Sequence, residues 1–492
     1  MNQNKDYLVE DTIEPLKSGA PLIIYIDLKS PYAYLSIEPT RSMIKELGIV
    51  ADWRPFVLDI PSYLGSAKLG KGGKKISKQN RTEEQWSDVK YAYFDCRRYA
   101  NLSDKTIKGT VKIWNTDLPA IGMLWLKKFS NLTEQCAEDS FLGRYIDAIY
   151  DSFWKREFDA EDLSSLLGVL KQINAPTDKF IEYAQLEGAA LNNHLQYSSF
   201  DAGIYGVPTY ILPGESKKDP QYEKFFGREH LPLISWLLTG RKGPSPHVAY
   251  KLSSYVNEEA LFKCAVEPKS APEIKMSPKQ LTTFFDFKSP QSYIALESIL
   301  STVNEGISIS WKPFLSNPLK APTKEVNDED RSTKHRRIRG EYMAKDIQRY
   351  ASHDLGNIYK KTDCYFADLG LLWLQYELKA SEETVNDYVK NIFVHLWCNH
   401  GVTNLPQDIE PFLFSSKRIQ LLEESGDKRK IVNYIEKWKE YVKSKGVQHL
   451  KLVREEAKFH SITTAPTFML GSEPFRGQAH LPLLIARIKA GI

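Results

Sequence analysis

Two serines stand where a hydroxyl group could act on a bound anion. Ser30 and Ser289 lie in the stretches PLIIYIDLKSPYAYLS (residues 21–36) and QLTTFFDFKSPQSYIA (residues 280–295). In each stretch a run with strand composition ends in Lys-Ser-Pro, where Ser suits a helix N-cap and Pro the first helical position. Each serine is therefore expected where a buried strand meets a helix N-terminus. The free N–H groups and positive dipole of such an end favour an anion.

The elements that position these serines occur twice along the chain. Five further pairs of landmarks follow in the same order and at similar spacing. They are Trp53–Phe56 with Trp311–Phe314, Asp95–Ala100 with Asp346–Ala351, Gly122–Leu126 with Gly370–Leu374, Tyr205–Tyr210 with Thr463–Phe468, and Phe226–Leu233 with Phe475–Leu483. The sequence thus predicts two repeats of one domain, at residues 20–240 and 280–492. An N-terminal tail (1–19) precedes them, and a linker rich in Pro, Ser and Lys (241–279) joins them.

Each repeat has the pattern of an α/β domain. The order is strand, helix, strand, a mostly helical middle, a β-hairpin and a last helix. The first helix is expected from about Pro31 to Leu47, with Gly48 as its C-terminal glycine. Helical periodicity covers residues 81–195 and 331–458. A β-α-β unit, a helical insertion and a β-β-α unit together constitute a thioredoxin fold with an inserted helical subdomain.

Composition and charge narrow the class of protein. A hydrophobic share of 42% and a charged share of 26% are those of a soluble globular protein, and no apolar run is long enough to span a membrane. The net charge of +4 implies no particular partner, and no nucleic-acid motif occurs. The first residues lack the pattern of a signal or transit peptide. Five scattered cysteines without a Cys-x-x-Cys motif favour a reducing compartment. The expected location is the cytoplasm, with mitochondrion and peroxisome as alternatives.

The motifs LKSPYAYL and FKSPQSYI resemble the Ser-Pro-Tyr-Ser-Tyr signature of 2-hydroxychromene-2-carboxylate isomerases and kappa-class glutathione transferases. Both families belong to the DsbA-like branch of the thioredoxin superfamily. The resemblance covers both repeats and implies two DsbA-like thioredoxin domains. Family members are usually single-domain chains that form dimers. The tandem arrangement therefore predicts a monomer in which the two repeats form an intramolecular pseudo-dimer.

The resemblance also implies a chemistry. Ser30 and Ser289 would be catalytic, each donating a hydrogen bond to the thiolate of bound glutathione. The helix N-terminus would stabilise the same negative sulfur, and both effects lower the pKa of the thiol. The substrate would be a small electrophile. The thiolate adds to it and leaves again in an isomerase, and stays attached in a transferase.

Further residues would hold glutathione if the resemblance extends to its site. Pro208 and Pro466 align with the cis-proline of the fold, and the residue before each would pair through its backbone with the extended ligand. The full set implied for glutathione binding is Tyr32, Val207, Pro208, Arg228, Glu229, Ala465, Pro466 and Gln478. No metal site is predicted.

The two repeats are not equivalent at these positions. The second has Gln291 in place of Tyr32 and Ala479 where the first has Glu229. A missing carboxylate would leave the ammonium group of glutathione without a partner. The sequence therefore predicts that Ser30→Ala removes most glutathione-dependent activity and that Ser289→Ala changes little beyond helix-cap stability.

Two other functions compete with this one. A non-catalytic thioredoxin-fold protein could bind a peptide or partner at the same cis-proline surface. A thiol-disulfide oxidoreductase of the DsbA type is third, because it needs an activated thiol that the Ser-Pro position lacks. Cys398 near His400 is interpreted as a structural cysteine. The basic runs Lys68–Lys78 and Arg331–Arg339 are interpreted as loops near the site. Solvated loops are the first interpretation and attraction of an anionic ligand the second. Nucleic-acid binding is third, because no nucleic-acid motif occurs.

Overall fold

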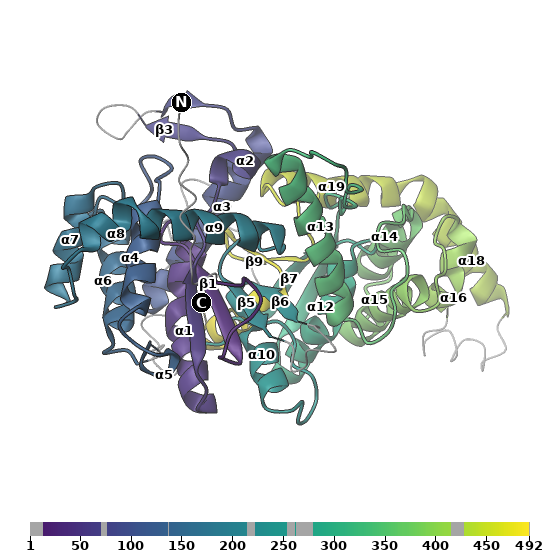
Figure 1. Cartoon of the computed structure of the whole chain (residues 1–492). Helices are drawn as coiled ribbons and strands as arrows, with labels where there is room; N and C mark the ends of the chain where they lie inside the picture. Colours follow the sequence, from purple (N-terminus) through teal and green to yellow (C-terminus); the bar gives the residue numbers. More distant parts are fainter. Residues whose placement is uncertain are drawn as a thin grey trace. The chain divides into compact units, whose positions relative to one another are not determined.

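The computed structural model describes residues 13–69, 76–135, 137–213, 222–252, 261, 279–414 and 428–491 (Figure 1). Contacts divide the chain into two compact units. Unit 1 comprises Met1–Val266 together with Pro322–Arg339, and unit 2 comprises Glu267–Ala321 together with Gly340–Ile492. The predicted domain boundaries stay a prediction. Much of the predicted tail and linker lies outside the described residues.

Unit 1 is built on a four-stranded mixed sheet. Its strands are β1 (Leu22–Ile26), β2 (Ala51–Pro55), β5 (Thr209–Leu212) and β6 (Glu223–Phe226), in the order β2-β1-β5-β6. β1 pairs with β2 in parallel and with β5 antiparallel, and β5 pairs with β6 antiparallel. All five residues of β1 are buried, as expected for an apolar central strand.

The helices of unit 1 divide into those beside the sheet and those inserted between β2 and β5. α1 (Pro31–Leu47) connects β1 to β2 and ends at Gly48, which adopts the left-handed conformation with φ 61°, as the sequence predicted. α10 (Leu231–Leu238) follows β6. The inserted elements are α2 (Ile60–Leu64), β3 (Ala67–Leu69), β4 (Ile76–Gln79), α3 (Glu83–Leu102), α4 (Asp117–Lys127), α5 (Leu132–Gln135), α6 (Phe141–Lys155), α7 (Leu163–Gln172), α8 (Phe180–Gln185) and α9 (Glu187–Asp201).

Unit 2 repeats this plan. Its sheet has the order β10-β9-β7-β8 with the same parallel and antiparallel pairings. The strands are β7 (Gln280–Phe285), β8 (Ser308–Pro313), β9 (Thr467–Leu470) and β10 (Glu473–Arg476). The helices are α12 (Pro290–Ser301), α14 (Tyr365–Leu372) with a π-helical turn (Trp373–Glu377), α15 (Glu382–Trp397), α16 (Pro406–Phe414), α18 (Lys428–Lys443), α19 (Lys445–Phe459) and α20 (Leu481–Ala490). This strand order with a helical insertion is the predicted thioredoxin-like architecture, and it is present twice.

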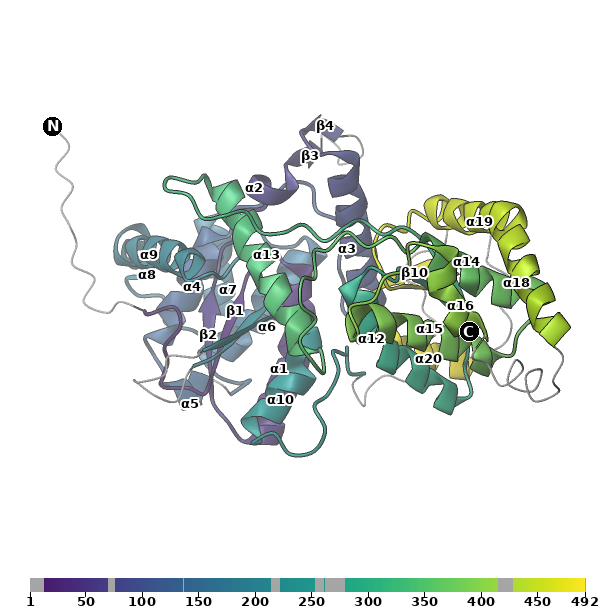
Figure 2. The ribbon, with the colours of Figure 1, turned by 90° about the vertical axis from the view of Figure 1, so that its right-hand side faces the viewer.

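One helix is shared between the units. α13 (Arg331–Arg349) contributes its residues up to Arg339 to unit 1 and the rest to unit 2. The start of α13 lies beside α2 (Figure 2). The interpretation of Arg331–Arg339 as a loop is therefore wrong, whereas helical periodicity from residue 331 onward is confirmed. The interpretation of Lys68–Lys78 as a loop is also wrong for its described residues, which belong to the paired strands β3 and β4. Residues 70–75 of this run lie outside the described residues.

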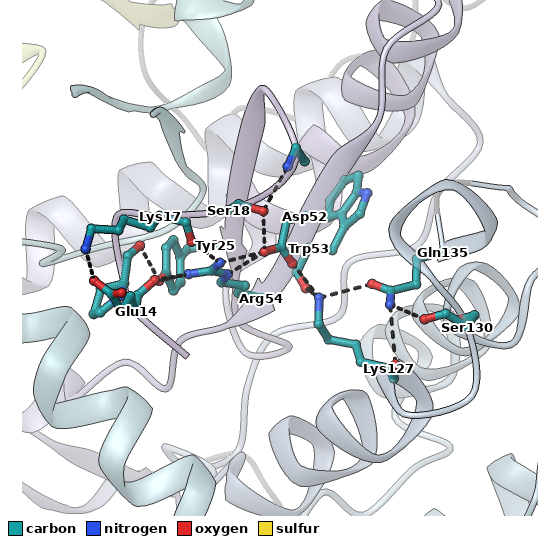
Figure 3. A network of polar contacts seen from close by, with 12 residues as sticks. Glu14, Lys17, Ser18, Tyr25, Asp52, Trp53, Arg54, Lys127, Ser130 and Gln135 are labelled. Carbon is teal, nitrogen blue, oxygen red and sulfur yellow. Dashed lines mark hydrogen bonds and ion pairs between the residues drawn. The ribbon is translucent and has the colours of Figure 1, made fainter. Parts of the chain in front are cut away.

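A buried polar network centred on Asp52 lies on β2, an edge strand of the unit 1 sheet (Figure 3). An Asp52 carboxylate oxygen accepts hydrogen bonds from Arg54 Nε at 2.9 Å and Nη2 at 2.6 Å, and Lys127 Nζ lies 2.5 Å from the other oxygen. Arg54 also donates to the carbonyl oxygens of Glu14 and Lys17. Burial alone would raise the pKa of Asp52, but the two cations lower it overall. The network ties the segment before β1 to β2.

Candidate functional site

Ser30 stands where the sequence placed it, between β1 and α1. Its Oγ accepts a hydrogen bond from the backbone N–H of Ala33 at 3.2 Å and so caps α1. The same hydroxyl donates to the carbonyl oxygen of Val207 at 3.4 Å, and the peptide bond from Val207 to Pro208 is cis. The Ser30 side chain is thus held between a helix N-terminus and the cis-proline loop, with only 5% of the residue exposed.

Ser289 repeats this geometry in unit 2. Its Oγ accepts from the N–H of Ser292 at 3.2 Å and donates to the carbonyl oxygen of Ala465 at 3.3 Å, before a cis bond to Pro466. The hydroxyl also lies 3.2 Å from the Gln291 side-chain oxygen. Both predicted cis bonds are therefore confirmed, and each unit brings its serine to the carbonyl that precedes them.

A buried aspartate supports each serine, a role that the sequence analysis did not assign. Asp27 accepts hydrogen bonds from Thr116 Oγ1 at 2.7 Å and from the Leu58 N–H at 2.7 Å. Asp286 accepts in the same way from the N–H and hydroxyl of Ser316. Burial raises the pKa of Asp286. Each carboxylate ties the turn before its serine to the loop after the second strand of its sheet. The sequence signal for this role was the occurrence of an Asp three residues before the serine in both Ser-Pro stretches.

The residues that favoured the first repeat are engaged within unit 1. Tyr32 donates its hydroxyl to Asp95 at 3.3 Å, and Asp95 pairs with Arg98 at 2.6 Å. The Arg228 guanidinium stands over the rings of Tyr99 and Tyr250, 4.4 and 4.5 Å from their centroids, and the two rings contact each other.

The stretch that follows the first repeat covers this end of the unit 1 site. The N–H of Ala249 donates to the Glu229 carbonyl oxygen at 3.0 Å, directly before Tyr250. The carboxylate of Glu229 lies against Gly227. Arg228 and Glu229 therefore lie beneath residues of the predicted linker.

The matching end of unit 2 carries an unpaired acceptor. Gln478, 6% exposed, has a side-chain oxygen with no hydrogen-bond partner among the described residues. Ala479 beside it is also buried. A buried amide oxygen without a partner is costly to a folded protein, and a ligand N–H would satisfy it.

The cis-proline loops differ in exposure. In unit 1, Gly206 and Val207 are buried, and Val207 is only 4% exposed. In unit 2, the equivalent Thr464 is exposed and Ala465 is half-buried. An extended ligand must reach the backbone of this loop in order to pair with it. The loop of unit 2 is accessible to such a ligand, and the loop of unit 1 is covered.

One contributor to the unit 1 loop was missed by the sequence analysis. His335, in the part of α13 that belongs to unit 1, donates from Nε2 to the carbonyl oxygen of Tyr205 at 3.1 Å. The residue lies within a run interpreted as a loop, and no local pattern marks it. Its distance along the chain from Tyr205 explains why sequence reasoning missed it.

The three described cysteines are not joined by disulfide bonds. Burial raises the pKa of the Cys96 and Cys364 thiols well above the usual range, which keeps them protonated. Cys398 Sγ lies 3.1 Å from the Tyr293 hydroxyl, and His400 is exposed. Cys136 and Cys264 lie outside the described residues. Among the residues placed by the structure, no group of three or more His, Cys, Asp or Glu side chains could hold a metal ion.

A small cavity lies behind β1 in unit 1. Asp27, Thr116, Met123 and Tyr150 are among its lining residues, and its volume is about 30 Å³. The Tyr150 hydroxyl has no hydrogen-bond partner among the described residues. A cavity of this size accommodates water rather than a substrate.

Comparisons with known proteins give structural likenesses alone. No protein-family profile and no curated protein sequence matches the chain. A solved 2-hydroxychromene-2-carboxylate isomerase is similar over 43% of this chain and 94% of its own, with 16% identity and a TM-score of 0.30. A probable DsbA oxidoreductase from Streptomyces coelicolor is similar over 47% of this chain and 94% of its own, with 13% identity and a TM-score of 0.31. At such scores neither likeness carries an argument about activity. In the described part of the chain, no helix has the length and apolar character needed to cross a bilayer.

Proposed function

We propose that the protein binds glutathione at the serine and cis-proline loop of unit 2 and uses it on a small electrophile, as an isomerase or a transferase. One observation carries the proposal. Ser289 holds its hydroxyl 3.3 Å from the carbonyl of Ala465, on a loop whose Thr464 is exposed, whereas the same loop of unit 1 is covered. The proposal therefore reverses the preference for the first repeat that residue identities alone suggest.

The residues of unit 2 suit such a ligand. The backbone of Ala465 can pair with an extended cysteinyl group, and the Gln478 oxygen can accept an N–H from the ligand's polar end. Bound glutathione would supply a thiolate nucleophile. Ser289 can turn its hydroxyl from Ala465 toward an anion, and the N-terminus of α12 adds its positive dipole. Both contributions stabilise negative charge at that position and lower the pKa of a thiol there.

A second candidate is a non-catalytic binding site for an extended peptide on the same loop. The observation that favours it is the bonding of the Ser289 hydroxyl, which lies within hydrogen-bond distance of both Ala465 and Gln291. If those contacts persist in the complex, the hydroxyl has no hydrogen bond to give to a thiolate. Backbone pairing would then supply the affinity without chemistry.

Titration of the full chain with glutathione and with S-methylglutathione separates these functions. We expect glutathione to bind at millimolar concentrations or below, with a thiol pKa lowered in the complex, as followed by thiolate absorbance against pH. Ser289→Ala should weaken thiolate binding by about ten- to a hundredfold, the usual size of a charge-assisted hydrogen bond. Ser30→Ala is the matched control: it removes an equivalent helix cap, at a cost of about 1 kcal/mol, and should leave binding unchanged.

Three results would contradict the proposal. Absence of glutathione binding at millimolar concentrations would exclude the glutathione site. Equal binding of the two ligands with an unshifted thiol pKa would favour the non-catalytic function. Loss of binding in Ser30→Ala with retention in Ser289→Ala would assign the site to unit 1.

A further inference from the structure

A segment of the second repeat is part of the first unit. Residues Pro322–Arg339 follow β8 in the sequence but belong by their contacts to unit 1 (Figure 2). Within the segment, Arg337 pairs with Glu329, which links the stretch before α13 to the helix itself. The segment is thus an ordered element of unit 1.

His335 is the buried centre of this contact. Its ring lies parallel to that of Tyr63, with 4.2 Å between centroids and 3° between planes, and meets the ring of Tyr205 edge-on at 5.6 Å. Its Nε2 donates to the carbonyl oxygen of Tyr205 at 3.1 Å. His335 is 6% exposed. The imidazole therefore joins α2, which contains Tyr63, to the residue two positions before Val207.

Ion pairs fix the register of the segment on either side of His335. Arg331 Nε lies 3.0 Å from Asp59, the N-cap residue of α2, and its guanidinium stands over the ring of Phe200 at 4.3 Å. Lys334 Nζ lies 2.6 Å from Asp201 at the end of α9. Such partly exposed pairs add little to the free energy of global unfolding. They hold the start of α13 in one position on unit 1, so their loss favours local release of the segment.

Unit 2 shows how the loop is held without such a segment. There the carbonyl oxygen of Thr463, equivalent to that of Tyr205, accepts from the backbone N–H of Asn317 at 2.8 Å. Asn317 follows Trp311 at the same spacing as Asp59 follows Trp53. In unit 1 that position pairs with Arg331 instead. In unit 1 the carbonyl of Tyr205 is thus bonded by the side chain of His335, a residue of the second repeat. In unit 2 the equivalent carbonyl is bonded by a backbone N–H of the same repeat.

We propose that residues 322–339 form a strap that keeps the cis-proline loop of unit 1 closed, with His335 as its positioning residue. Release of the strap would expose the loop of unit 1, as the loop of unit 2 is exposed already. The proposal does not depend on the ligand that unit 2 binds, because it concerns the access of solvent and ligands to residues 203–208.

Hydrogen exchange of the full chain tests the strap. His335→Phe keeps an aromatic ring against Tyr63 but loses the N–H donor, and we expect the protection of residues 203–208 to fall at least tenfold. His335→Gln retains an N–H donor and should restore most of that protection. His194→Ala, an exposed histidine on α9, is the control and should change nothing. Protection of residues 463–468 in unit 2 should stay constant in all variants.

The exchange pattern also defines the results that would overturn the proposal. Unchanged protection of residues 203–208 in His335→Phe would show that the strap does not hold the loop. An equal loss of protection in both units would indicate general destabilisation. If His335→Phe does not fold, the double variant Arg331→Ala with Lys334→Ala removes the flanking ion pairs at partly exposed positions. Its protection at residues 203–208 must then fall, or the proposal is wrong.

Discussion

Ser30 and Ser289 are held by the same two hydrogen bonds and differ in what covers the loop beside them. The local sequence determines the shared part, because a Ser-Pro pair after a strand caps a helix wherever it occurs. The access of a ligand to the cis-proline loop depends on residues that are distant in the sequence. In unit 1, Tyr250 covers Arg228, and His335 contacts Tyr205. A comparison of motif residues therefore identifies the position of a site but not whether a ligand can reach it.

The lowered pKa of His335 predicts that the free energy of unfolding depends on pH. Burial lowers the pKa of His335 to about 4, and Arg339 and Arg331 act in the same direction. The hydrogen bond to the Tyr205 carbonyl and the charge of Asp59 oppose this shift. The titratable rings of Tyr63 and Tyr205 also contact the imidazole. The folded state therefore binds a proton only near pH 4, whereas the unfolded chain binds one near 6.5. The stabilisation is complete above about pH 6.5 and is lost as the pH falls toward 4, by at most roughly 3 kcal/mol.

Urea unfolding of the parent and of His335→Phe between pH 7.5 and 4 checks this expectation. The free energy of unfolding of the parent should fall more steeply across that window, because the phenyl ring does not titrate. Other groups that titrate in the window contribute to both proteins and cancel in the difference. Parallel curves would show that His335 is not protonated on unfolding and would contradict its buried, neutral state.

At the scale of elements, the Asp52 network provides a test of what anchors the sheet of unit 1. Asp52→Asn would leave Arg54 and Lys127 as buried cations without a carboxylate, and we expect a loss of about 3–5 kcal/mol in unfolding free energy. The pKa of Asp52 is lowered in the folded state, so its contribution is present above the unfolded pKa near 3.8 and is lost as the pH falls below that value.

A matched exposed pair supplies the control for the network. Glu161→Gln breaks the more exposed pair with Lys112 and should cost less than about 1 kcal/mol. Urea unfolding at neutral pH measures both variants. A loss in Asp52→Asn as small as that in Glu161→Gln would show that water or rearranged side chains compensate the two cations.

Elements were predictable where their pattern is local. α1 begins at Pro31 and ends at Gly48 as expected, because Pro and Gly act within one turn of the helix. The start of α13 is a different case. Its sequence, RSTKHRRIRG, is almost entirely polar, yet His335, Arg337 and Ile338 are buried. The surface that buries them is in unit 1, so periodicity within the second repeat could not identify the run as a packed face.

At the scale of the whole molecule, α13 belongs partly to unit 1 and partly to unit 2. We therefore expect the two repeats to stay associated after the chain between them has been cut. We expect a monomer in solution. If a site for a specific protease is placed within residues 262–278 and cleaved, the N-terminal fragment still holds residues 322–339 of the other fragment as part of unit 1. Both fragments should then elute as one species of unchanged mass in size-exclusion chromatography with light scattering.

The same cleavage in a variant with a weakened strap tests whether residues 322–339 hold the fragments together. In a chain that also carries Arg331→Ala, Lys334→Ala and His335→Ala, the fragments should separate or associate at least tenfold more weakly. Separation of the fragments of the cleaved chain without these three substitutions would contradict the prediction. It would show that residues 322–339 bind the first repeat too weakly to hold the fragments together.

The shared helix also bears on how the chain is made. A ribosome completes the first repeat long before it reaches Arg339, the last residue that unit 1 requires. The interval corresponds to about 100 residues of further synthesis, or roughly 5–20 s at usual rates of translation. During that time the nascent first repeat has a formed Ser-Pro turn but no His335 to place against Tyr63 and Tyr205. The closed loop of unit 1 is thus a late product of synthesis, although most of its residues are among the first to emerge.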